Sequence, residues 1–273
     1  MSKIPLAGVI GCPVGHSRSP VLHGTWLRDY GIAGHYVPLH VEPGDLAQVL
    51  RAMPAMGFVG ANVTIPHKEA ALALADEVSD IAARIGAANT LSFEGGRSVA
   101  DNTDGYGFMA NLRQNAPDWR ADQGAALILG AGGAARAIIV ALQDAGAPEI
   151  RITNRTRARA DALAAEFGLT VVDWDARSQA LGDLGLLVNT TSLGMAGQGA
   201  LEMPLAGLPE RALVTDIVYT PLETPLLRDA RARGLRVVDG LGMLLHQAAP
   251  GFARWFGGKP QVTDALRRAV LGA

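Results

Sequence analysis

The sequence is poor in features that mark several classes of protein. Its single cysteine, Cys12, cannot form an internal disulfide or supply a zinc cluster of several thiolates, and it suits a reducing cytoplasm. Lys and Arg number 24 against 26 Asp and Glu, so no basic excess is present to neutralise nucleic acid phosphates. The longest apolar run, Ala125–Ala135, contains three glycines and is too short to cross a bilayer. We therefore expect a cytoplasmic protein without nucleic acid or membrane partners.

Apolar residues and glycine are abundant. Hydrophobic residues make up 49% of the 273 residues, which excludes a disordered chain and predicts one large domain or two modest ones. Many of the 33 glycines lie in short runs beside apolar segments. Such runs are typical of places where the backbone comes close to another group.

The first part of the chain alternates between segments typical of strands and of helices. This order predicts a mostly parallel sheet with helices on its faces. The expected strands are Leu6–Gly11, His35–Leu39 and Gly60–Ile65, and the expected helices are Ser19–Tyr30, Gly44–Met53 and His67–Leu74.

A second alternating series predicts another sheet, and Asp104–Asn115 is expected to be a connecting helix. The series has expected strands Ala125–Leu129, Glu149–Thr153, Leu184–Asn189 and Ala212–Asp216, and expected helices Ala134–Ala145 and Ala158–Phe167. Two final helices, Leu241–Trp255 and Thr263–Leu271, are expected to return to the first domain and leave a cleft between the two domains. We therefore divide this α/β chain into residues 1–104 with 241–273, and residues 105–240.

A glycine-rich turn follows the first strand of the second series. Gly130-x-Gly132-x-x-Ala135 matches the dinucleotide-binding fingerprint of a Rossmann-type domain. Gly130 permits the tight turn, Gly132 lets the backbone approach a pyrophosphate, and Ala135 allows close packing of the next helix. The start of that helix offers free N–H groups to phosphate. The alternative interpretation is an ordinary glycine-rich connection between a strand and a helix.

The end of the next strand indicates which dinucleotide is bound. An NAD site usually has an acidic residue there, whereas this chain has Arg155, with Arg157 and Arg159 close behind. A guanidinium suits the 2′-phosphate of NADP in charge and geometry. The alternative is a solvated basic helix start, which the helix dipole disfavours unless an anion binds. We therefore expect an NADP-binding domain.

Two polar motifs of the first domain follow expected strands. Ser17 and Ser19 can hold a carboxylate, although Ser19 can equally be only a helix N-cap before a proline. Asn62 and Thr64 share one face of their strand, at its carboxyl end. Lys68 lies in the first turn of the following helix, a position expected to lower its pKa and to suit it to proton transfer. His67 is interpreted as a packing or surface residue.

Two further motifs contain Asn89 and Asp104. On local grounds, Asn89 can be a structural residue and Asp104 a helix N-cap. In the functional interpretation, Lys68 and Asp104 form a charge pair at a reacting hydroxyl. Cys12 is interpreted as a small buried residue rather than a nucleophile, and no metal is expected because the histidines show no ligand spacing with carboxylates.

Together these motifs resemble the shikimate/quinate dehydrogenase family. The matching stretches run in the family's order from Gly11 to Ala248: GCPVGHSRSP, GANVTIPHKE, GAANT, DNTDGYGF, LGAGGAARA, NRT, NTTSLGM and DGLGMLLHQA. The resemblance implies a substrate-binding and catalytic domain, an NADP-binding Rossmann domain and an active site in the cleft between them. It implies reduction of 3-dehydroshikimate to shikimate with NADPH, in aromatic amino-acid biosynthesis.

The resemblance also implies roles for individual residues. Lys68 and Asp104 would be the catalytic pair. The substrate would be bound by Ser17, Ser19, Asn62, Thr64, Asn89, Tyr219 and Gln247. The cofactor would be bound by Gly130, Ala131, Gly132, Gly133, Ala134 and Ala135 at the pyrophosphate, by Asn154, Arg155, Thr156 and Arg159 at the 2′-phosphate, and by Thr190, Ser192, Gly240 and Met243 at the nicotinamide.

Four alternatives remain open from the sequence. An NAD-linked quinate dehydrogenase is disfavoured by Arg155 and by the paired serines. No residue discriminates against a relative acting on aminoshikimate. A non-catalytic NADP-binding regulator would not require both Lys68 and Asp104, and the chemistry of a folate-linked dehydrogenase would not explain the serines. The expected assembly is a monomer or a homodimer.

Overall fold

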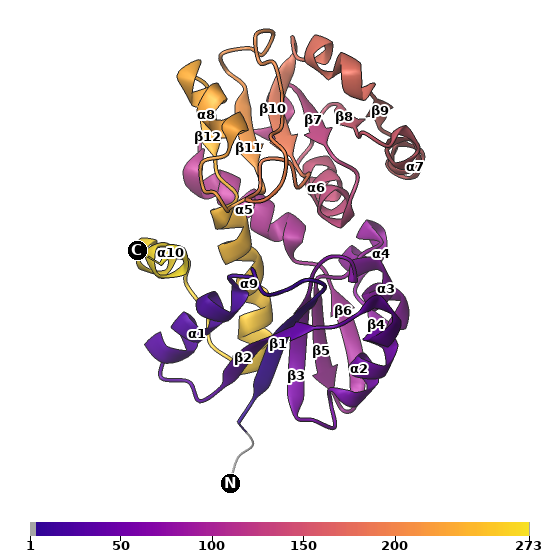
Figure 1. Cartoon of the computed structure of the whole chain (residues 1–273), viewed down its shortest axis with the longest axis vertical. Coiled ribbons are helices and arrows are strands. Elements are labelled where there is room, and N and C mark those ends of the chain that lie inside the picture. Colours follow the sequence, from indigo (N-terminus) through magenta and orange to yellow (C-terminus); the bar gives the residue numbers. More distant parts are fainter. Residues whose placement is uncertain (1–3, 273) are drawn as a thin grey trace. The chain divides into compact units, whose positions relative to one another are not determined.

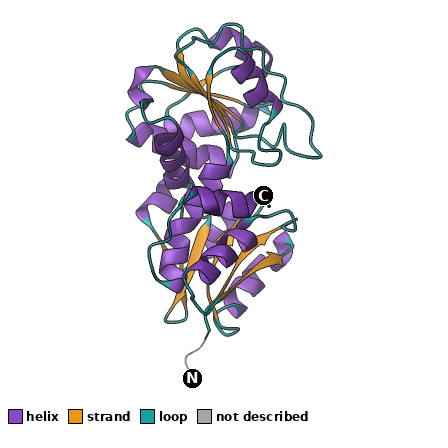
Figure 2. Ribbon diagram, turned by 90° about the vertical axis from the view of Figure 1, so that its left-hand side faces the viewer, coloured by secondary structure: helices purple, strands orange, loops and turns teal. Residues whose placement is uncertain are grey.

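The computed structural model describes residues 4–272, which form two compact units (Figure 1). Unit 1 comprises the residues up to Gly107 together with those from Leu244 onward, and unit 2 comprises Phe108–Met243. In each unit a six-stranded sheet is flanked by helices (Figure 2). None of the helices within residues 4–272 is long and apolar enough to span a bilayer.

The sheet of unit 1 is mixed, and parallel pairings prevail. Its strands are β1 (Leu6–Gly11), β2 (His35–His40), β3 (Phe58–Val63), β4 (Glu77–Val78), β5 (Thr90–Glu94) and β6 (Arg97–Asp101), in the order β2-β1-β3-β5-β6-β4. The pairs β1–β2, β1–β3 and β4–β6 are parallel, whereas β3–β5 and β5–β6 are antiparallel. The alternation of segments did not predict the β5–β6 hairpin. Its turn is made by Gly95 and Gly96, both at positive φ, where glycine is favoured.

The last helix and most of the one before it belong to unit 1. The helices that lie wholly in unit 1 are α1 (Ser19–Asp29), α2 (Leu46–Ala52), α3 (Lys68–Leu74), α4 (Asp80–Ile85) and α10 (Asp264–Leu271), while α5 (Asp104–Asn115) and α9 (Leu241–Phe256) each contain a unit boundary. The indole N–H of Trp255 on α9 donates to the carbonyl of Leu91 on β5. The indole N–H of Trp26 on α1 donates to the carbonyl of Gln261, just before α10. These bonds tie the last part of the chain to unit 1.

Unit 2 contains an all-parallel sheet with the strand order of a Rossmann domain. Its strands are β7 (Ala125–Leu129), β8 (Ile150–Thr153), β9 (Thr170–Val171), β10 (Leu184–Asn189), β11 (Leu213–Asp216) and β12 (Arg236–Val238), in the order β12-β11-β10-β7-β8-β9. Helices α6 (Gly133–Asp144), α7 (Arg157–Phe167) and α8 (Pro225–Ala232) complete the unit. The order reverses at β7 and β10, and ligands of such sheets bind at the carboxyl ends of the strands there.

Alternate side chains of β7 pack into core clusters on opposite faces of this sheet. Ala126 and Ile128 lie in the core cluster that α6 also lines, whereas Leu127 and Leu129 lie in the core cluster that α8 also lines. Successive side chains of a strand point to opposite faces, so an uninterrupted apolar run fits a strand buried on both sides. The loop that follows β7 is therefore carried by a fully buried strand.

Candidate active site

Lys68 and Asp104 contact each other in unit 1. Lys68 is the first residue of α3, and Asp104 is the first residue of α5. The Lys68 ammonium donates a hydrogen bond to Oδ2 of Asp104, and the two side chains are only 15% and 8% exposed. Because Asp104 begins the helix, it is not the N-cap that the local interpretation allowed, and its carboxylate instead faces Lys68. The pair thus joins two residues that lie 36 positions apart.

Asn89 connects this pair to other candidate substrate residues. Its Nδ2 group lies 2.8 Å from Oδ1 of Asp104 and 3.1 Å from Oε1 of Gln247, on α9. Its Oδ1 accepts the backbone N–H of Thr103 at 2.9 Å. Asn89 and Asp104 are buried, and a buried polar group must find its partners within the protein. Asn89 therefore fixes the orientation of the Asp104 carboxylate.

Asn62 belongs to the same buried network. It lies on β3, and its Nδ2 donates to the backbone carbonyl of Asn89 and to Oγ1 of Thr90. Its Oδ1 accepts the hydroxyl of Tyr36 at 2.7 Å. Burial raises the pKa of Tyr36 well above its ordinary value, so the hydroxyl stays protonated and donates. His23, whose pKa burial lowers to about 3, stacks on the Tyr36 ring as a neutral imidazole.

Three further candidate substrate residues lie near the carboxyl ends of β1 and β3. Ser19 is buried and is the first residue of α1, so it is not the N-cap; that position belongs to Arg18. The backbone N–H of Ser19 donates to Oγ of Ser17 at 3.3 Å. Thr64 is half-buried just beyond β3, and its N–H donates to the carbonyl of Ile10 on β1.

The interpretation of Cys12 as a buried residue is wrong. Cys12 is half-buried, because it follows the last residue of β1 at the edge of the core. Its Sγ lies 3.6 Å from Nε2 of His40 and 3.4 Å from Oε2 of Glu42, and desolvation together with Glu42 raises the pKa of the thiol. His67, in contrast, is buried, and its Nε2 contacts the carbonyl of Val41 at 2.8 Å. It is a packing residue.

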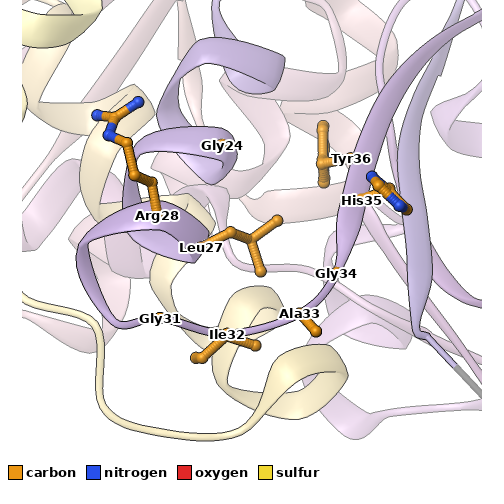
Figure 3. Close-up of a pocket in the computed structure, with 9 residues that line it drawn as sticks. All are labelled: Gly24, Leu27, Arg28, Gly31, Ile32, Ala33, Gly34, His35 and Tyr36. Carbon is orange, nitrogen blue, oxygen red and sulfur yellow. The ribbon is translucent and has the colours of Figure 1, made fainter. Parts of the chain in front are cut away.

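A surface hollow of about 590 Å³ also lies in unit 1 (Figure 3). It is bordered by α1 and β2, and its lining is Gly24, Leu27, Arg28, Gly31, Ile32, Ala33, Gly34, His35 and Tyr36. Small-molecule sites combine an apolar lining with a few convergent polar groups. Lys68, Asp104 and Asn89 do not line this hollow, whereas Tyr36, which donates to Asn62, belongs both to its lining and to the polar network.

The glycine loop of unit 2 leaves room for a ligand against its backbone. Gly130 has φ +109°, and a Cβ there would lie 2.6 Å from Oγ1 of Thr190, which donates to the carbonyl of Leu129. Gly132 is the exposed N-cap of α6, and a Cβ there would meet nothing within 4 Å. Ala135 is fully buried in the core. Ala131, Gly133 and Ala134 are half-buried at the helix start.

The arginines after β8 differ in their ion-pair and hydrogen-bond partners. Arg157 pairs with Asp161 and Asp173. The guanidinium groups of Arg155 and Arg159 are exposed, and within residues 4–272 they have no hydrogen-bond or ion-pair partner. The Nδ2 of Asn154 donates to the carbonyl of Thr156 and shapes the turn between them. Two cations therefore remain available to an anion beside the carboxyl end of β8.

The remaining candidates lie after β10, β11 and β12. Ser192 is exposed, Tyr219 is half-buried, and Gly240 and Met243 are buried. Sequence reasoning missed the network that shapes these loops. Asn189 donates to Oδ1 of Asp216 at 2.9 Å and accepts the hydroxyl of Thr191 at 2.7 Å. Burial raises the pKa of Asp216 to about 6, against its ordinary value of 3.8.

Two residues of the unit 1 network were also missed. Thr103 lies inside the motif around Asp104, and its hydroxyl donates to the carbonyl of Gln247 at 2.8 Å, so the motif itself could have identified it. No local signal marks Tyr36. Its place follows from the parallel pairing of β1 with β2, in which Ala7 is the partner of Tyr36.

Three family profiles match most of the chain. The profile described as the shikimate dehydrogenase substrate binding domain matches residues 9–91, the one described as shikimate / quinate 5-dehydrogenase matches residues 112–194, and the one described as the shikimate 5′-dehydrogenase C-terminal domain matches residues 240–271. The curated protein "Shikimate dehydrogenase (NADP(+))" of Paracoccus denitrificans is 65% identical over 98% of this chain and 96% of its own length. The chain belongs to the shikimate dehydrogenase family.

Solved structures of this family have the same fold. The shikimate 5-dehydrogenase of Thermus thermophilus, solved in complex with NADP(H) and shikimate, is 40% identical, with 99% of both chains covered and a TM-score of 0.88. The quinate dehydrogenase of Corynebacterium glutamicum, solved in complex with NAD, is 31% identical, with 99% of both chains covered and a TM-score of 0.91. The fold alone therefore does not separate shikimate from quinate, or NADP from NAD.

Proposed function

We propose that this chain is an NADP-dependent shikimate dehydrogenase, which catalyses the reversible reduction of 3-dehydroshikimate to shikimate in aromatic amino-acid biosynthesis. The observation that carries the proposal is the contact of Lys68 with Asp104 inside a buried network of neutral polar side chains. The high identity to a curated NADP-dependent shikimate dehydrogenase supports the same substrate and cofactor.

The reduction of a ketone to an alcohol needs a hydride at carbon and a proton at oxygen. Bound NADPH supplies the hydride. Lys68 supplies the proton from Nζ to the ketone oxygen, and it takes a proton back from the hydroxyl in the oxidation direction. Asp104 holds Nζ in place, and Asn89 in turn holds the Asp104 carboxylate. A positioned acid with a fixed partner is what such a step requires.

The neutral side chains account for recognition of a polyhydroxylated ring. Asn62, Asn89 and Gln247 carry amides that are oriented by the network, so ring hydroxyls would meet donors and acceptors in fixed positions. Ser17 and Ser19 lie at the start of α1 and would hold the carboxylate. Thr64, at the end of β3, completes this set of short polar side chains.

The residues of unit 2 fit NADP. The open backbone at Gly132 and the start of α6 offer N–H groups to the pyrophosphate. The guanidinium groups of Arg155 and Arg159, which have no partner among the described residues, suit a 2′-phosphate, and the sequence directly after β8 has no acidic residue to bind a free ribose hydroxyl. Thr190, Ser192, Gly240 and Met243 would lie at the nicotinamide.

A steady-state assay tests the proposal. Purified chain is given shikimate or quinate, each with NADP or NAD, and the absorbance of the reduced cofactor is followed. We expect the highest kcat/KM with shikimate and NADP. Activity mainly on quinate with NAD would contradict the assignments of Arg155 and Ser17. Binding of NADP without turnover of either substrate would favour a regulator on the same fold.

Two attributes belong to the same proposal. A cytoplasmic location suits a free thiol such as that of Cys12. We also propose that the chain acts as a monomer or a homodimer, and light scattering at assay concentration distinguishes these assemblies.

A further inference from the structure

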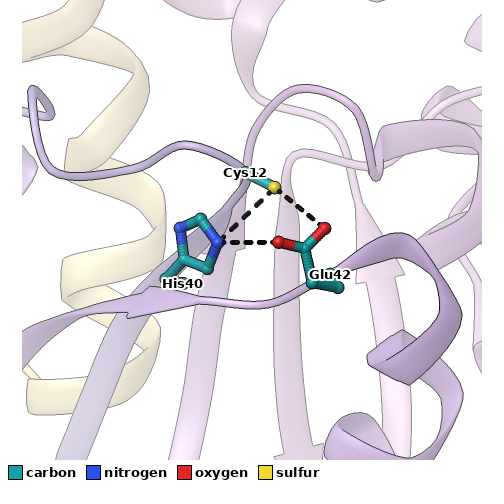
Figure 4. A group of neighbouring side chains, drawn as sticks. All are labelled: Cys12, His40 and Glu42. Atoms are coloured by element: carbon teal, nitrogen blue, oxygen red, sulfur yellow. Dashed lines mark hydrogen bonds and ion pairs between the residues drawn. The ribbon is translucent and has the colours of Figure 1, made fainter.

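Three different metal-binding side chains converge beside the carboxyl end of β1 (Figure 4). Nε2 of His40 lies 3.6 Å from Sγ of Cys12 and 3.1 Å from Oε1 of Glu42, while Oε2 of Glu42 lies 3.4 Å from the same sulfur. This Cys12–His40–Glu42 cluster shares no residue with the candidate active site. It therefore needs an explanation of its own.

The backbone holds the three side chains in this arrangement. Gly11 of β1 is the parallel partner of His40 on β2, and the N–H of Val41 donates to the carbonyl of Gly11. The N–H of Cys12 donates to the carbonyl of Ile65 at 3.1 Å. Because His40 and Glu42 are two positions apart in extended chain, their side chains leave on the same side. The cluster is thus built on sheet register rather than on a free loop.

The spacing of the donor atoms matches a metal centre. A tetrahedral Zn²⁺ has bonds of about 2.3 Å to thiolate, about 2.0 Å to imidazole and about 2.1 Å to carboxylate, which places its ligand atoms about 3.4–3.6 Å apart. Nε2 of His40 lies 3.6 Å from Sγ and 3.1 Å from Oε1 of Glu42, within a few tenths of an ångström of these values, while Oε2, the other oxygen of Glu42, lies 3.4 Å from Sγ. With one ligand atom taken from each residue, the three donor atoms all lie within 4.8 Å of one another.

We propose that Cys12, His40 and Glu42 form a binding site for a divalent transition-metal ion of the Zn²⁺ type. Thiolate and imidazole ligands select such ions, whereas Mg²⁺ and Ca²⁺ require oxygen ligands throughout. His40 and Glu42 are more than half exposed, so an ion can enter from solvent, and water can take the fourth position. Binding replaces the thiol proton by the S–metal bond and releases that proton to solvent.

The position of the cluster gives a bound ion a structural effect. Cys12 opens the segment that leads from β1 to Ser17 and Ser19, while His40 and Glu42 belong to the segment that leaves β2. One ion would therefore tie these two segments together. The proposal does not rest on the proposed enzymatic function, because every donor atom lies outside the residues assigned to it.

Metal binding by the tag-free full chain tests the proposal in three ways. In competition with a chromophoric chelator, we expect the chain to take up a single Zn²⁺. Substitution of Co²⁺ should produce a thiolate-to-metal charge-transfer band in the near ultraviolet. Because Cys12 is the single cysteine, saturation with Zn²⁺ should also slow the reaction of the chain with a thiol reagent. A large excess of Mg²⁺ should change none of these signals.

Variants assign the site. Cys12→Ser, His40→Gln and Glu42→Gln should each weaken Zn²⁺ binding by roughly tenfold or more, and Cys12→Ser should abolish the charge-transfer band. His35→Gln removes an exposed histidine from the same strand and should bind like the unmodified chain. Equal thermal unfolding midpoints would show that the variants are folded. Unchanged affinity in Cys12→Ser, unchanged thiol reactivity with Zn²⁺, or no uptake by the unmodified chain would each overturn the proposal.

Discussion

The two units prepare for their ligands in different ways. In unit 1 the network side chains Asn62, Asn89 and Asp104 are buried and hydrogen-bonded, with Asn89 between Asp104 and Gln247. In unit 2 the candidate groups are the backbone at Gly132 and the exposed guanidinium of Arg155, which no side chain within residues 4–272 holds. The difference follows from ligand chemistry. The ring hydroxyls of the proposed substrate are uncharged, whereas a dinucleotide offers phosphates that attract N–H groups and cations.

Pre-organisation has an energetic basis in unit 1. A buried polar group without a partner costs about 1–3 kcal/mol, so each amide of the network is held where its partners are. Hydroxyl groups of a substrate then meet donors and acceptors that are already oriented. Phosphate binding in unit 2 needs less pre-organisation. Charge-assisted hydrogen bonds are stronger than neutral ones, and the exposed guanidinium can adjust its position to the phosphate.

The largest effect is expected from removing the charge pair of unit 1. Lys68→Ala should lower kcat by about 10²–10⁴-fold, because the proton of the reaction loses its positioned donor. Asp104→Asn should have a smaller effect in the same direction. Binding of NADP, followed by fluorescence titration, should not change. Lys259→Ala, an exposed lysine substitution, is the matched control. Retention of kcat in Lys68→Ala would contradict the assignment of Lys68 as the proton donor.

Local patterns predicted the elements of both units better than their contacts. The alternation of strands and helices, the turn at Gly130 and the basic Arg155 are all carried by short stretches of sequence. The contact of Lys68 with Asp104 depends on where α3 and α5 begin, and it required the fold. Tyr36 and the Cys12–His40–Glu42 cluster depend on the register of β1 with β2. Register across parallel strands leaves no trace in either segment alone.

Unit 2 also contains a buried polar network, which joins Asn189, Thr191 and Asp216. The pH dependence of stability tests the environment of its carboxyl group. Burial raises the pKa of Asp216 to about 6 from its ordinary value of 3.8. Between these two pH values the Asp216 carboxyl is protonated in the folded chain and ionised in the unfolded chain. The contribution of Asp216 to the free energy of unfolding should therefore fall by about 2 kcal/mol as pH rises from about 4 to about 6.

Urea unfolding measures this fall as a difference between two proteins. Carboxylates with lowered pKa, such as Glu149 and Asp183, give the opposite slope, so the unmodified chain must be compared with Asp216→Asn at each pH. The advantage of the unmodified chain over the variant should shrink through this window. Asp118→Asn, at an exposed site, is the control substitution. A constant difference for Asp216→Asn would contradict the raised pKa of the Asp216 carboxyl.

Because Arg155 is not part of a hydrogen-bonded network within the described part of the chain, its substitution should affect only its own contact with the cofactor. Arg155→Ala should raise KM for NADPH by roughly 10–100-fold, the equivalent of one charge-assisted hydrogen bond, and should leave KM for NADH nearly unchanged. Arg157→Ala is the matched control, since Asp161 and Asp173 already hold that side chain. An equal change with both cofactors would contradict the assignment of Arg155 to the 2′-phosphate.

The smallest effect concerns a residue that we expect to act on the substrate only through another. Tyr36→Phe removes the hydroxyl that holds Oδ1 of Asn62 and keeps the ring that stacks on His23. If unit 1 depends on oriented amides, KM for shikimate should rise by roughly 3–10-fold, which corresponds to one neutral hydrogen bond, with little change in KM for NADPH.

The control for this substitution separates orientation from stability. Tyr30→Phe removes a hydroxyl that accepts the N–H of Gln261 at the surface of the same unit, and it should change neither KM. An Asn62→Ala change made in both backgrounds completes the comparison, because Tyr36→Phe should then have no further effect on KM. If Tyr36→Phe raises KM equally with and without Asn62, the hydroxyl does not act through the amide. The network of unit 1 would then stabilise the fold rather than orient side chains for substrate binding.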